Sequence, residues 1–164
     1  MKILVTSDTH GIYSAISDYI LIHKDIDLLV HAGDGVEDVK NIAYETDINY
    51  EVVTGNNDYS SNEAFEKIIE VEDIKIFLTH GNQYGVYYGE DQVLDKAKEL
   101  NCNIAIHGHT HKCLNITKDD ITILNPGSVS IPRDNNPGFF ILDIDAGVFE
   151  ITRVSTNKEI KWQD

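Results

Sequence analysis

Five short segments of this chain carry side chains that bind metal ions, and each follows a predicted strand. They are Asp8-Thr9-His10, Gly33-Asp34-Gly35, Gly55-Asn56-Asn57-Asp58, Thr79-His80-Gly81 and Gly108-His109-Thr110-His111. Imidazole nitrogen together with carboxylate and amide oxygen suits Mn2+, Fe2+, Zn2+, Ni2+ or Co2+. The set contains no thiolate, which argues against a structural zinc cage. These residue types predict a transition-metal site.

The spacing of the residues favours one shared site. Asp8 and His10 are two residues apart, and so are His109 and His111. In extended backbone such residues point to the same side, so each pair is predicted to face one centre. Neighbouring glycines permit tight turns and close approach of the backbone; they are Gly11, Gly33, Gly35, Gly55, Gly81 and Gly108.

The elements that must position these segments alternate in the first half of the chain. Apolar patterns predict strands at 2–6, 27–32 and 51–54, and helices at 13–24 and 36–46. This order is typical of a largely parallel sheet with crossover helices. Ligands bind such sheets at the carboxyl ends of the strands, where the five segments are expected to meet.

The second half predicts shorter strands and fewer helices. A hairpin is expected at 67–71 and 75–79, a helix at 90–100, and strands at 103–107, 113–117, 122–124, 139–143 and 148–154. Mixed parallel and antiparallel strands with few helices indicate an α/β protein with two sheets packed face to face and helices outside. The length fits a single domain over 1–164.

Composition excludes several classes of function. The chain is 41% hydrophobic and 25% charged, as in globular proteins, and its formal net charge is −15. That charge repels polyanions, so stable binding to nucleic acid or to an anionic membrane is not expected. No apolar run approaches the ~20 residues that cross a bilayer. With no signal-like start and only two cysteines, Cys102 and Cys113, a cytoplasmic protein with reduced thiols is expected.

The five segments, in this order, resemble the calcineurin-like metallophosphoesterase family, and more narrowly its small bacterial and archaeal phosphodiesterase branch. The segment Asn125-Pro126-Gly127-Ser128 also matches that branch, so the resemblance covers most of the chain. Any one motif is common, whereas five in order with suitable spacing are specific. The resemblance implies a four-layer α/β/β/α sandwich of two mixed sheets.

The resemblance also implies a site for two divalent metal ions. Mn2+ is the expected ion, and Ni2+, Zn2+, Fe2+ and Co2+ are compatible. Two cations ~3.5–4 Å apart repel, so a shared carboxylate is expected between them. The implied reaction is hydrolysis of a small phosphate ester, by preference a diester, through attack of a metal-bridging hydroxide. By similarity, Asp8, His10, Asp34 and His111 would hold the first metal, and Asp34 would bridge to the second, which Asn56, His80 and His109 complete.

Asn57 departs from the family pattern. Many members carry Gly-Asn-His-Asp, in which the histidine is thought to protonate the leaving group. An amide donates hydrogen bonds but is no general acid at neutral pH, so Asn57 is expected to contact the phosphoryl group only. The next residue, Asp58, is assigned to the catalytic set as a group that orients a neighbouring ligand or caps a turn.

Several residues keep two interpretations. His31 and His107 either pack in the core or support a metal ligand. Three tyrosines of one loop, Tyr84, Tyr87 and Tyr88, either form a rim at the site or pack on the sandwich edge. Arg133 either clamps a phosphate or pairs with an acidic neighbour.

Two other classes of function compete with the enzyme. A non-catalytic scaffold is one, because a retromer subunit with the metallophosphoesterase fold acts mainly through protein contacts. A different dinuclear hydrolase, such as a peptidase or lactonase, is the other, although the His-x-His-x-Asp-His run of such proteins is absent. The sequence leaves a homo-oligomer open.

Overall fold

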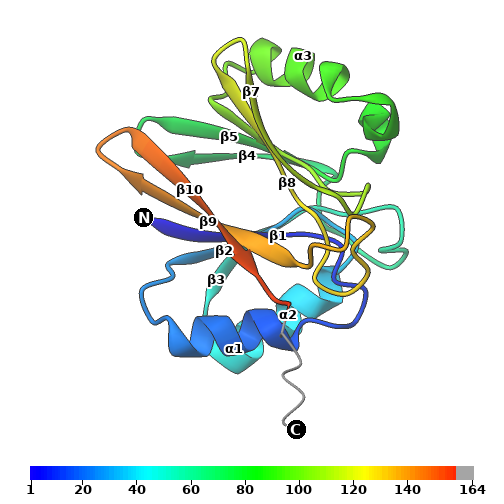
Figure 1. Cartoon of the computed structure of the whole chain (residues 1–164), viewed down its shortest axis with the longest axis vertical. Coiled ribbons are helices and arrows are strands. Elements are labelled where there is room, and N and C mark those ends of the chain that lie inside the picture. Colours follow the sequence, from blue (N-terminus) through cyan, green and yellow to red (C-terminus); the bar gives the residue numbers. More distant parts are fainter. Residues whose placement is uncertain (158–164) are drawn as a thin grey trace, which may run out of the picture.

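Two five-stranded sheets pack face to face in this protein (Figure 1). The structure, a computed structural model, describes residues 1–157, so residues 158–164 of the predicted domain lie outside the described part. The first sheet has the order β10 (Val148–Ser155), β9 (Gly138–Asp145), β1 (Lys2–Thr6), β2 (Leu28–His31) and β3 (Asn49–Val52). Helices α1 (Ser14–Ile22) and α2 (Val36–Thr46) cover its outer face.

The second sheet carries a helix on its own outer face. Its order is β4 (Glu66–Val71), β5 (Ile74–Thr79), β6 (Ile104–Ile106), β8 (Ile121–Pro126) and β7 (Cys113–Lys118). Above it lie α3 (Asp91–Glu99) and two short 3-10 turns, η1 (Asn82–Tyr84) and η2 (Val86–Tyr88). The predicted four-layer α/β/β/α sandwich is therefore confirmed.

Burial on both faces explains the unbroken apolar runs of the central strands. In β1, Ile3 and Val5 join the core between the sheets, whereas Leu4 joins the core under α1 and α2. All three are fully buried. Successive side chains of a strand point to opposite faces, so a strand covered on both sides has no polar face.

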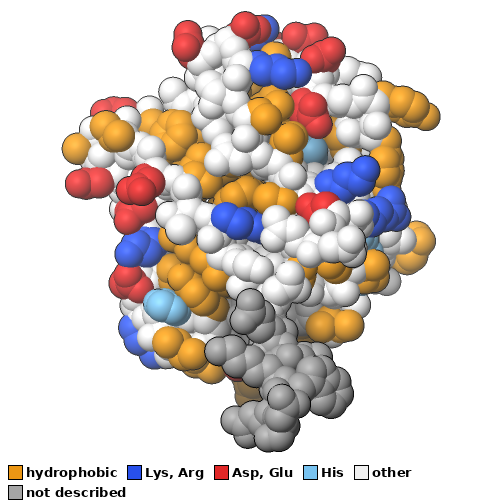
Figure 2. Space-filling model, viewed as in Figure 1, with side chains coloured by type: hydrophobic (Ala, Val, Ile, Leu, Met, Phe, Trp, Pro, Cys, Tyr) orange, Lys and Arg blue, Asp and Glu red, His pale blue; other side chains and the backbone are white. Residues whose placement is uncertain are grey.

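The acidic composition appears on the surface as separate carboxylates. Figure 2 shows Asp and Glu side chains around α3 and around the turn that joins β9 to β10. In the described part of the chain, no helix has the length and hydropathy needed to cross a bilayer. Both cysteines are free, with Cys102 buried and Cys113 half-buried.

Two local predictions need correction. The third strand was expected at 51–54, but β3 spans Asn49–Val52, because the Thr54 N–H donates to the Ala64 carbonyl outside the sheet. The segment over 82–90, which carries the three tyrosines and was interpreted as a loop, contains the short 3-10 turns η1 and η2. Gly85, between them, has φ 58°, a left-handed conformation that glycine adopts without strain.

The topology brings the polar segments to one edge. Strands β1, β2 and β3 run parallel in the first sheet, and β5, β6 and β8 run parallel in the second. The loops that follow these strands gather on the right of Figure 1. This arrangement agrees with the expectation that the carboxyl ends of the parallel strands form the site.

Candidate metal centre

Two groups of side chains lie close enough to hold metal ions. One comprises Asp8, His10 and His111, and the other comprises Asp8, Asp34 and His80; in each, the ligand atoms lie within 4.8 Å of one another. All but His10 are buried. Each group combines carboxylate oxygen with imidazole nitrogen, as the sequence predicted.

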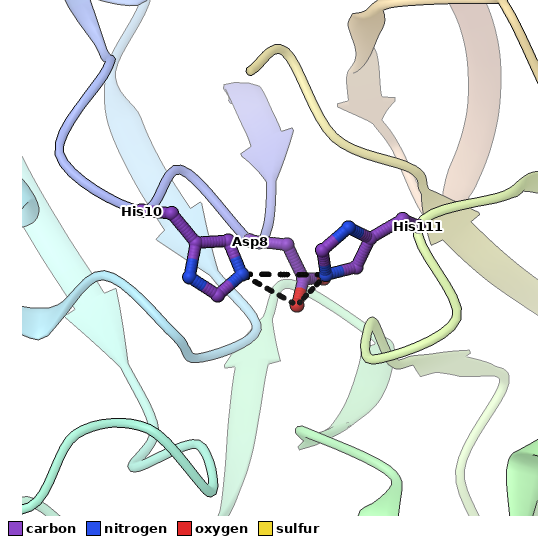
Figure 3. Close-up of side chains that lie close together, drawn as sticks. All are labelled: Asp8, His10 and His111. Atoms are coloured by element: carbon purple, nitrogen blue, oxygen red, sulfur yellow. Dashed lines mark hydrogen bonds and ion pairs between the residues drawn. The ribbon is translucent and has the colours of Figure 1, made fainter. Parts of the chain in front are cut away.

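The first group surrounds His111 (Figure 3). Its Nε2 atom lies 3.2 Å from Asp8 Oδ1 and 3.3 Å from His10 Nε2. Asp34, from the other group, places its Oδ2 atom 3.7 Å from His10 Nε2. Ligands bound at 2.0–2.2 Å around one metal are about 3.0–3.5 Å apart, so these separations leave room for a single ion.

The second group surrounds His80. Its Nε2 atom lies 3.0 Å from Asn56 Oδ1, 3.3 Å from His109 Nδ1 and 3.5 Å from Asp34 Oδ2. Asn56 and His109 belong to neither carboxylate–histidine group but lie against this one. Two oxygens, Asp34 Oδ2 and Asp8 Oδ1, each lie within 4 Å of a histidine from both groups, as a carboxylate shared by two ions would have to.

The hydrogen bonds of the Asp8 carboxylate indicate whether a cation fits at this position. Its Oδ2 accepts hydrogen bonds from Ser7 Oγ at 2.6 Å and from the His109 N–H at 2.9 Å. Its Oδ1 is buried and has no hydrogen-bond partner among the described residues. A buried carboxylate oxygen without a donor is costly, and a cation would satisfy it. The donors therefore fit a metal ion at this point.

Carbonyl groups fix the orientation of two histidines. His80 Nδ1 lies 2.7 Å from the Ala32 carbonyl, and His111 Nδ1 lies 2.9 Å from the Ile131 carbonyl. A carbonyl accepts only, so each Nδ1 carries a proton, and Nε2 is the atom that a neutral ring offers to a metal ion. Metal-binding histidines are commonly oriented in this way.

Both central carboxylates are ionised at neutral pH. Burial opposes ionisation of Asp34, but His80 and the hydrogen bonds from Asn57 bring its pKa well below the usual range. Burial also opposes ionisation of Asp8, whose pKa is nevertheless lowered by His111, His80 and Ser7. Anionic oxygen donors are ready for a divalent cation without loss of a proton.

The backbone of the ligand segments differs from the prediction. Extended backbone was expected at Asp8/His10 and His109/His111, but all four residues, like Asp34, have φ between 46° and 69°. Asp and His tolerate this left-handed region better than most residues. Because the chain turns immediately after each strand, His109 faces His80 while His111 faces His10. The expectation that each pair faces one centre is wrong for His109/His111.

Asp58 holds the loop that carries Asp34. Its carboxylate accepts hydrogen bonds from four backbone N–H groups, those of Asp34, Gly35, Val36 and Gly55, at 2.8–3.1 Å. Three of these donors lie at or before the first turn of α2, which has no side-chain cap of its own. Negative charge at a helix N-terminus is favourable. These contacts are those of a positioning residue.

Asn57 contacts Asp34 through two groups. Its backbone N–H donates to Asp34 Oδ1 at 2.8 Å, and its Nδ2 donates to Asp34 Oδ2 at 2.7 Å. The side chain is exposed, and the residue lines a cavity of about 340 Å³ together with His10, Gly35 and Tyr59. Nδ2 has two hydrogens, so one remains for a bound group.

His31 supports the site from beneath. Its Nδ1 accepts the Gly33 N–H at 3.1 Å, so the proton is on Nε2, which lies 3.1 Å from Thr9 Oγ1. The Thr9 hydroxyl donates to Asp38 Oδ2 at 2.5 Å, and the same oxygen accepts the Gly11 N–H. The network joins the loop of Asp34 to the loop of His10, which favours the supporting role over simple packing.

Neutral His31 makes stability depend on pH. Burial lowers its pKa from 6.5 to about 4. Between these values the unfolded chain binds more protons than the folded one, so the stability falls as the pH falls through this window. We expect the metal-free protein to lose about 3 kcal/mol from this residue between pH ~6.5 and ~4. The measurement is the unfolding free energy of wild type and His31→Gln at each pH, and the difference between them should shrink on acidification. The exposed His23→Gln is the control, and an unchanged difference would contradict the prediction.

Supporting residues outside the predicted ligand set lie late in the chain. Ser128 Oγ donates to the Asp8 carbonyl at 2.7 Å, and Asn125 Nδ2 donates to the Gly108 carbonyl at 2.9 Å. Both belong to the Asn125–Ser128 segment, which had been noted only as a family match. The signal that could have assigned it a role is its place at the carboxyl end of β8, at the same edge as the ligands.

Two glycines are required by close packing at the ligands. A Cβ atom on Gly55 would lie 2.2 Å from Asp34 Oδ1, and one on Gly108 would lie 1.9 Å from Ser7 Oγ and 2.5 Å from Asp8 Oδ2. No side chain fits at these distances. The expectation that the backbone approaches the site closely is confirmed at both residues.

His107 and the three tyrosines of the loop lie in different surroundings, which decides between their two interpretations. His107 is buried with Nδ1 3.1 Å from the Gly108 carbonyl, and it contacts no metal donor side chain. Tyr84 packs edge-on against Phe77 and donates to Glu66, so it takes the packing role. Tyr87 lies against the His109 ring, and Tyr88 is almost fully exposed.

Comparison with known proteins gives one consistent result. Residues 1–147 match the calcineurin-like phosphoesterase superfamily domain. A probable metallophosphoesterase of Methanothermobacter thermautotrophicus is 31% identical, over 98% of this chain and 95% of its own length. A phosphodiesterase of Methanocaldococcus jannaschii is 29% identical over 88% and 94%. The structure of Vps29 from Entamoeba histolytica complexed with Zn2+ has a TM-score of 0.77 at 25% identity, covering 96% of this chain and 100% of that one.

Proposed function

Because the chain belongs to the calcineurin-like phosphoesterase superfamily, we propose that it hydrolyses a small phosphodiester with two divalent cations, Mn2+ being the expected ion. The first would be held by Asp8, His10, Asp34 and His111, and the second by Asp34, Asn56, His80 and His109. The observation that carries the proposal is that two carboxylate oxygens, Asp8 Oδ1 and Asp34 Oδ2, each lie within 4 Å of both His10 and His80. The resemblance to the family assigns the shared position to Asp34. When bound, such cations lower the pKa of water and neutralise charge on a phosphoryl group.

The protein's own groups bind and orient the ester. The free N–H of Asn57 Nδ2 donates to a phosphoryl oxygen placed beside Asp34. Asp58 acts through Asp34, since it holds the backbone that presents this carboxylate. The cavity next to Asn57 accommodates one substituent of the ester. No side chain of this set donates a proton to the leaving oxygen, which therefore takes it from water.

Preference for a diester rests on charge. A monoester dianion needs more positive charge around its terminal oxygens than a diester monoanion. No lysine or arginine makes an ion pair with Asp8 or Asp34 in the described part of the chain, where histidines are their partners. The relative named a phosphodiesterase supports the same choice.

Metal removal provides the direct test. We expect protein stripped with a chelator to lose hydrolysis of bis(4-nitrophenyl) phosphate and to regain it with Mn2+, with two ions bound per chain. Hydrolysis of 4-nitrophenyl phosphate should be slower under the same conditions. Bound metal is measured on the same sample by elemental analysis. A protein that binds two ions yet hydrolyses neither ester would instead support a scaffold, the alternative that the likeness to Vps29 makes specific.

Asn57→His should change the dependence on the leaving group. A histidine here restores a group able to protonate the leaving oxygen, a contribution of at least about 100-fold where protonation limits the rate. We expect kcat to rise about tenfold or more for an alkyl leaving group and little for 4-nitrophenol. Asn57→Gln keeps the amide and is the control. Equal changes for both leaving groups would show that proton donation is not what residue 57 lacks.

A further inference from the structure

Arg133 is fixed at the rim of the candidate metal centre. Its backbone N–H donates to the His111 carbonyl at 2.9 Å, and its Nη1 donates to Tyr87 Oη at 2.6 Å. Tyr87 Oη in turn donates to the His109 carbonyl at 3.2 Å. The guanidinium therefore lies beside the segment that carries two of the metal-binding histidines, although the side chain is exposed.

Tyr87 is held by the same residues. Its ring meets the His109 ring at 70° with centroids 4.8 Å apart, and Arg133 Cζ lies 5.7 Å from the Tyr87 centroid. Both separations are typical of favourable aromatic and cation–π contacts. An exposed arginine ordinarily samples many rotamers, so these contacts reduce the entropy lost when it binds a ligand.

The charge of Arg133 is not used within the protein. The chain has 28 acidic and 13 basic residues, yet no carboxylate of residues 1–157 lies within 4.0 Å of this guanidinium. Tyr87 takes one of its five N–H donors. In Figure 2, Lys and Arg side chains lie beside histidine on the right, where the ligand loops gather. A cation left free in so acidic a chain favours an anion from outside.

The guanidinium lies at one side of the candidate metal centre, next to the segment of His109 and His111. Asp8 and Asp34 mark the centre of the site, and neither has Arg133 within ion-pair distance. The only side-chain hydrogen bond of Arg133 within residues 1–157 is to Tyr87, so the guanidinium is placed to receive a group that extends from the centre toward Tyr87.

We propose that Arg133, held by Tyr87, binds a second anionic group of the substrate, a phosphate or carboxylate on a substituent of the scissile phosphodiester. The inference rests on the proposed phosphodiesterase activity and adds a substrate class to it. The guanidinium forms paired hydrogen bonds with such oxyanions. Tyr87 is the positioning residue, and Arg133 is the binding residue.

Two substrates that differ only in the second anion test this. They are thymidine 5′-(4-nitrophenyl phosphate) with and without a 3′-phosphate, which share the scissile bond and leaving group. For the Mn2+-loaded wild type we expect kcat/KM to be about tenfold higher with the 3′-phosphate, mainly through KM. Arg133→Gln should reduce the ratio to about one while keeping turnover of the other substrate. Tyr87→Phe should give an intermediate ratio with kcat unchanged, and Arg133→Lys should keep part of it.

Lys98→Gln is the matched control, because it removes one exposed positive charge on α3 and should leave the ratio unchanged. An equal loss on both substrates in Arg133→Gln would overturn the proposal and assign the arginine to the scissile phosphoryl group. A wild type that turns over both substrates equally would overturn it and leave the phosphodiesterase intact. A wild type that hydrolyses neither substrate would overturn both.

Discussion

Asp34→Asn is expected to lower metal-dependent hydrolysis of bis(4-nitrophenyl) phosphate by about a thousandfold or more. The substitution keeps the shape of the side chain but removes the charge that lies between His10 and His80. Without that charge, two cations repel each other across the site, so the second ion should bind weakly. Kinetics and bound metal should be measured on the same preparation.

The control for this variant is Asp143→Asn. Asp143 is exposed on β9 and pairs in register with Lys2, at the end of β1 away from the site. The Asp143→Asn substitution changes the net charge by the same amount as Asp34→Asn. The activity of this control variant should equal that of the wild type. If Asp34→Asn binds two ions and keeps near-normal turnover, the assignment of Asp34 as the shared ligand is wrong.

Asp58→Ala is expected to cost about 3 kcal/mol of unfolding free energy, because Asp58 holds the backbone of two loops. It leaves four backbone N–H groups without their acceptor, and each loss costs roughly 1 kcal/mol where water can reach the group. The charge at the start of α2 is also lost. Chemical denaturation measures the effect.

Activity of the folded Asp58→Ala protein should fall about 10–100-fold, as when the support of a metal ligand is removed. For the unfolding free energy, Glu37→Gln is the control, because Glu37 is also acidic, lies in the first turn of α2 and accepts none of the four N–H groups. Equal stability of Asp58→Ala and Glu37→Gln would show that the cap is dispensable.

Local patterns predicted most of the ligands because they follow strands with clear apolar runs. Val5 and Thr6 end β1 immediately before the Ser7–Asp8 pair, and His80 directly follows β5. The resemblance to a known family then supplied the grouping into two metals, which the separations around His80 and His111 support.

Local sequence patterns could not predict the contacts between segments that are distant in the chain. Ser128 supports Asp8 across 120 residues, and Asp58 caps a helix that begins 22 residues earlier. Left-handed backbone at Asp8 and His109 could not be anticipated, because neither residue is a glycine. Sequence spacing carries only short-range geometry, whereas these features depend on how two sheets approach each other.

The order of the parallel strands has a consequence for the cohesion of the molecule. Asp8, His10, Asp34 and Asn56 follow strands of the first sheet, whereas His80, His109 and His111 follow strands of the second. Any ion that takes donors from both sets is a cross-link between the two halves of the sandwich. Metal binding should therefore raise the free energy needed to separate the two sheets, because an ion that binds only the folded arrangement stabilises it by mass action.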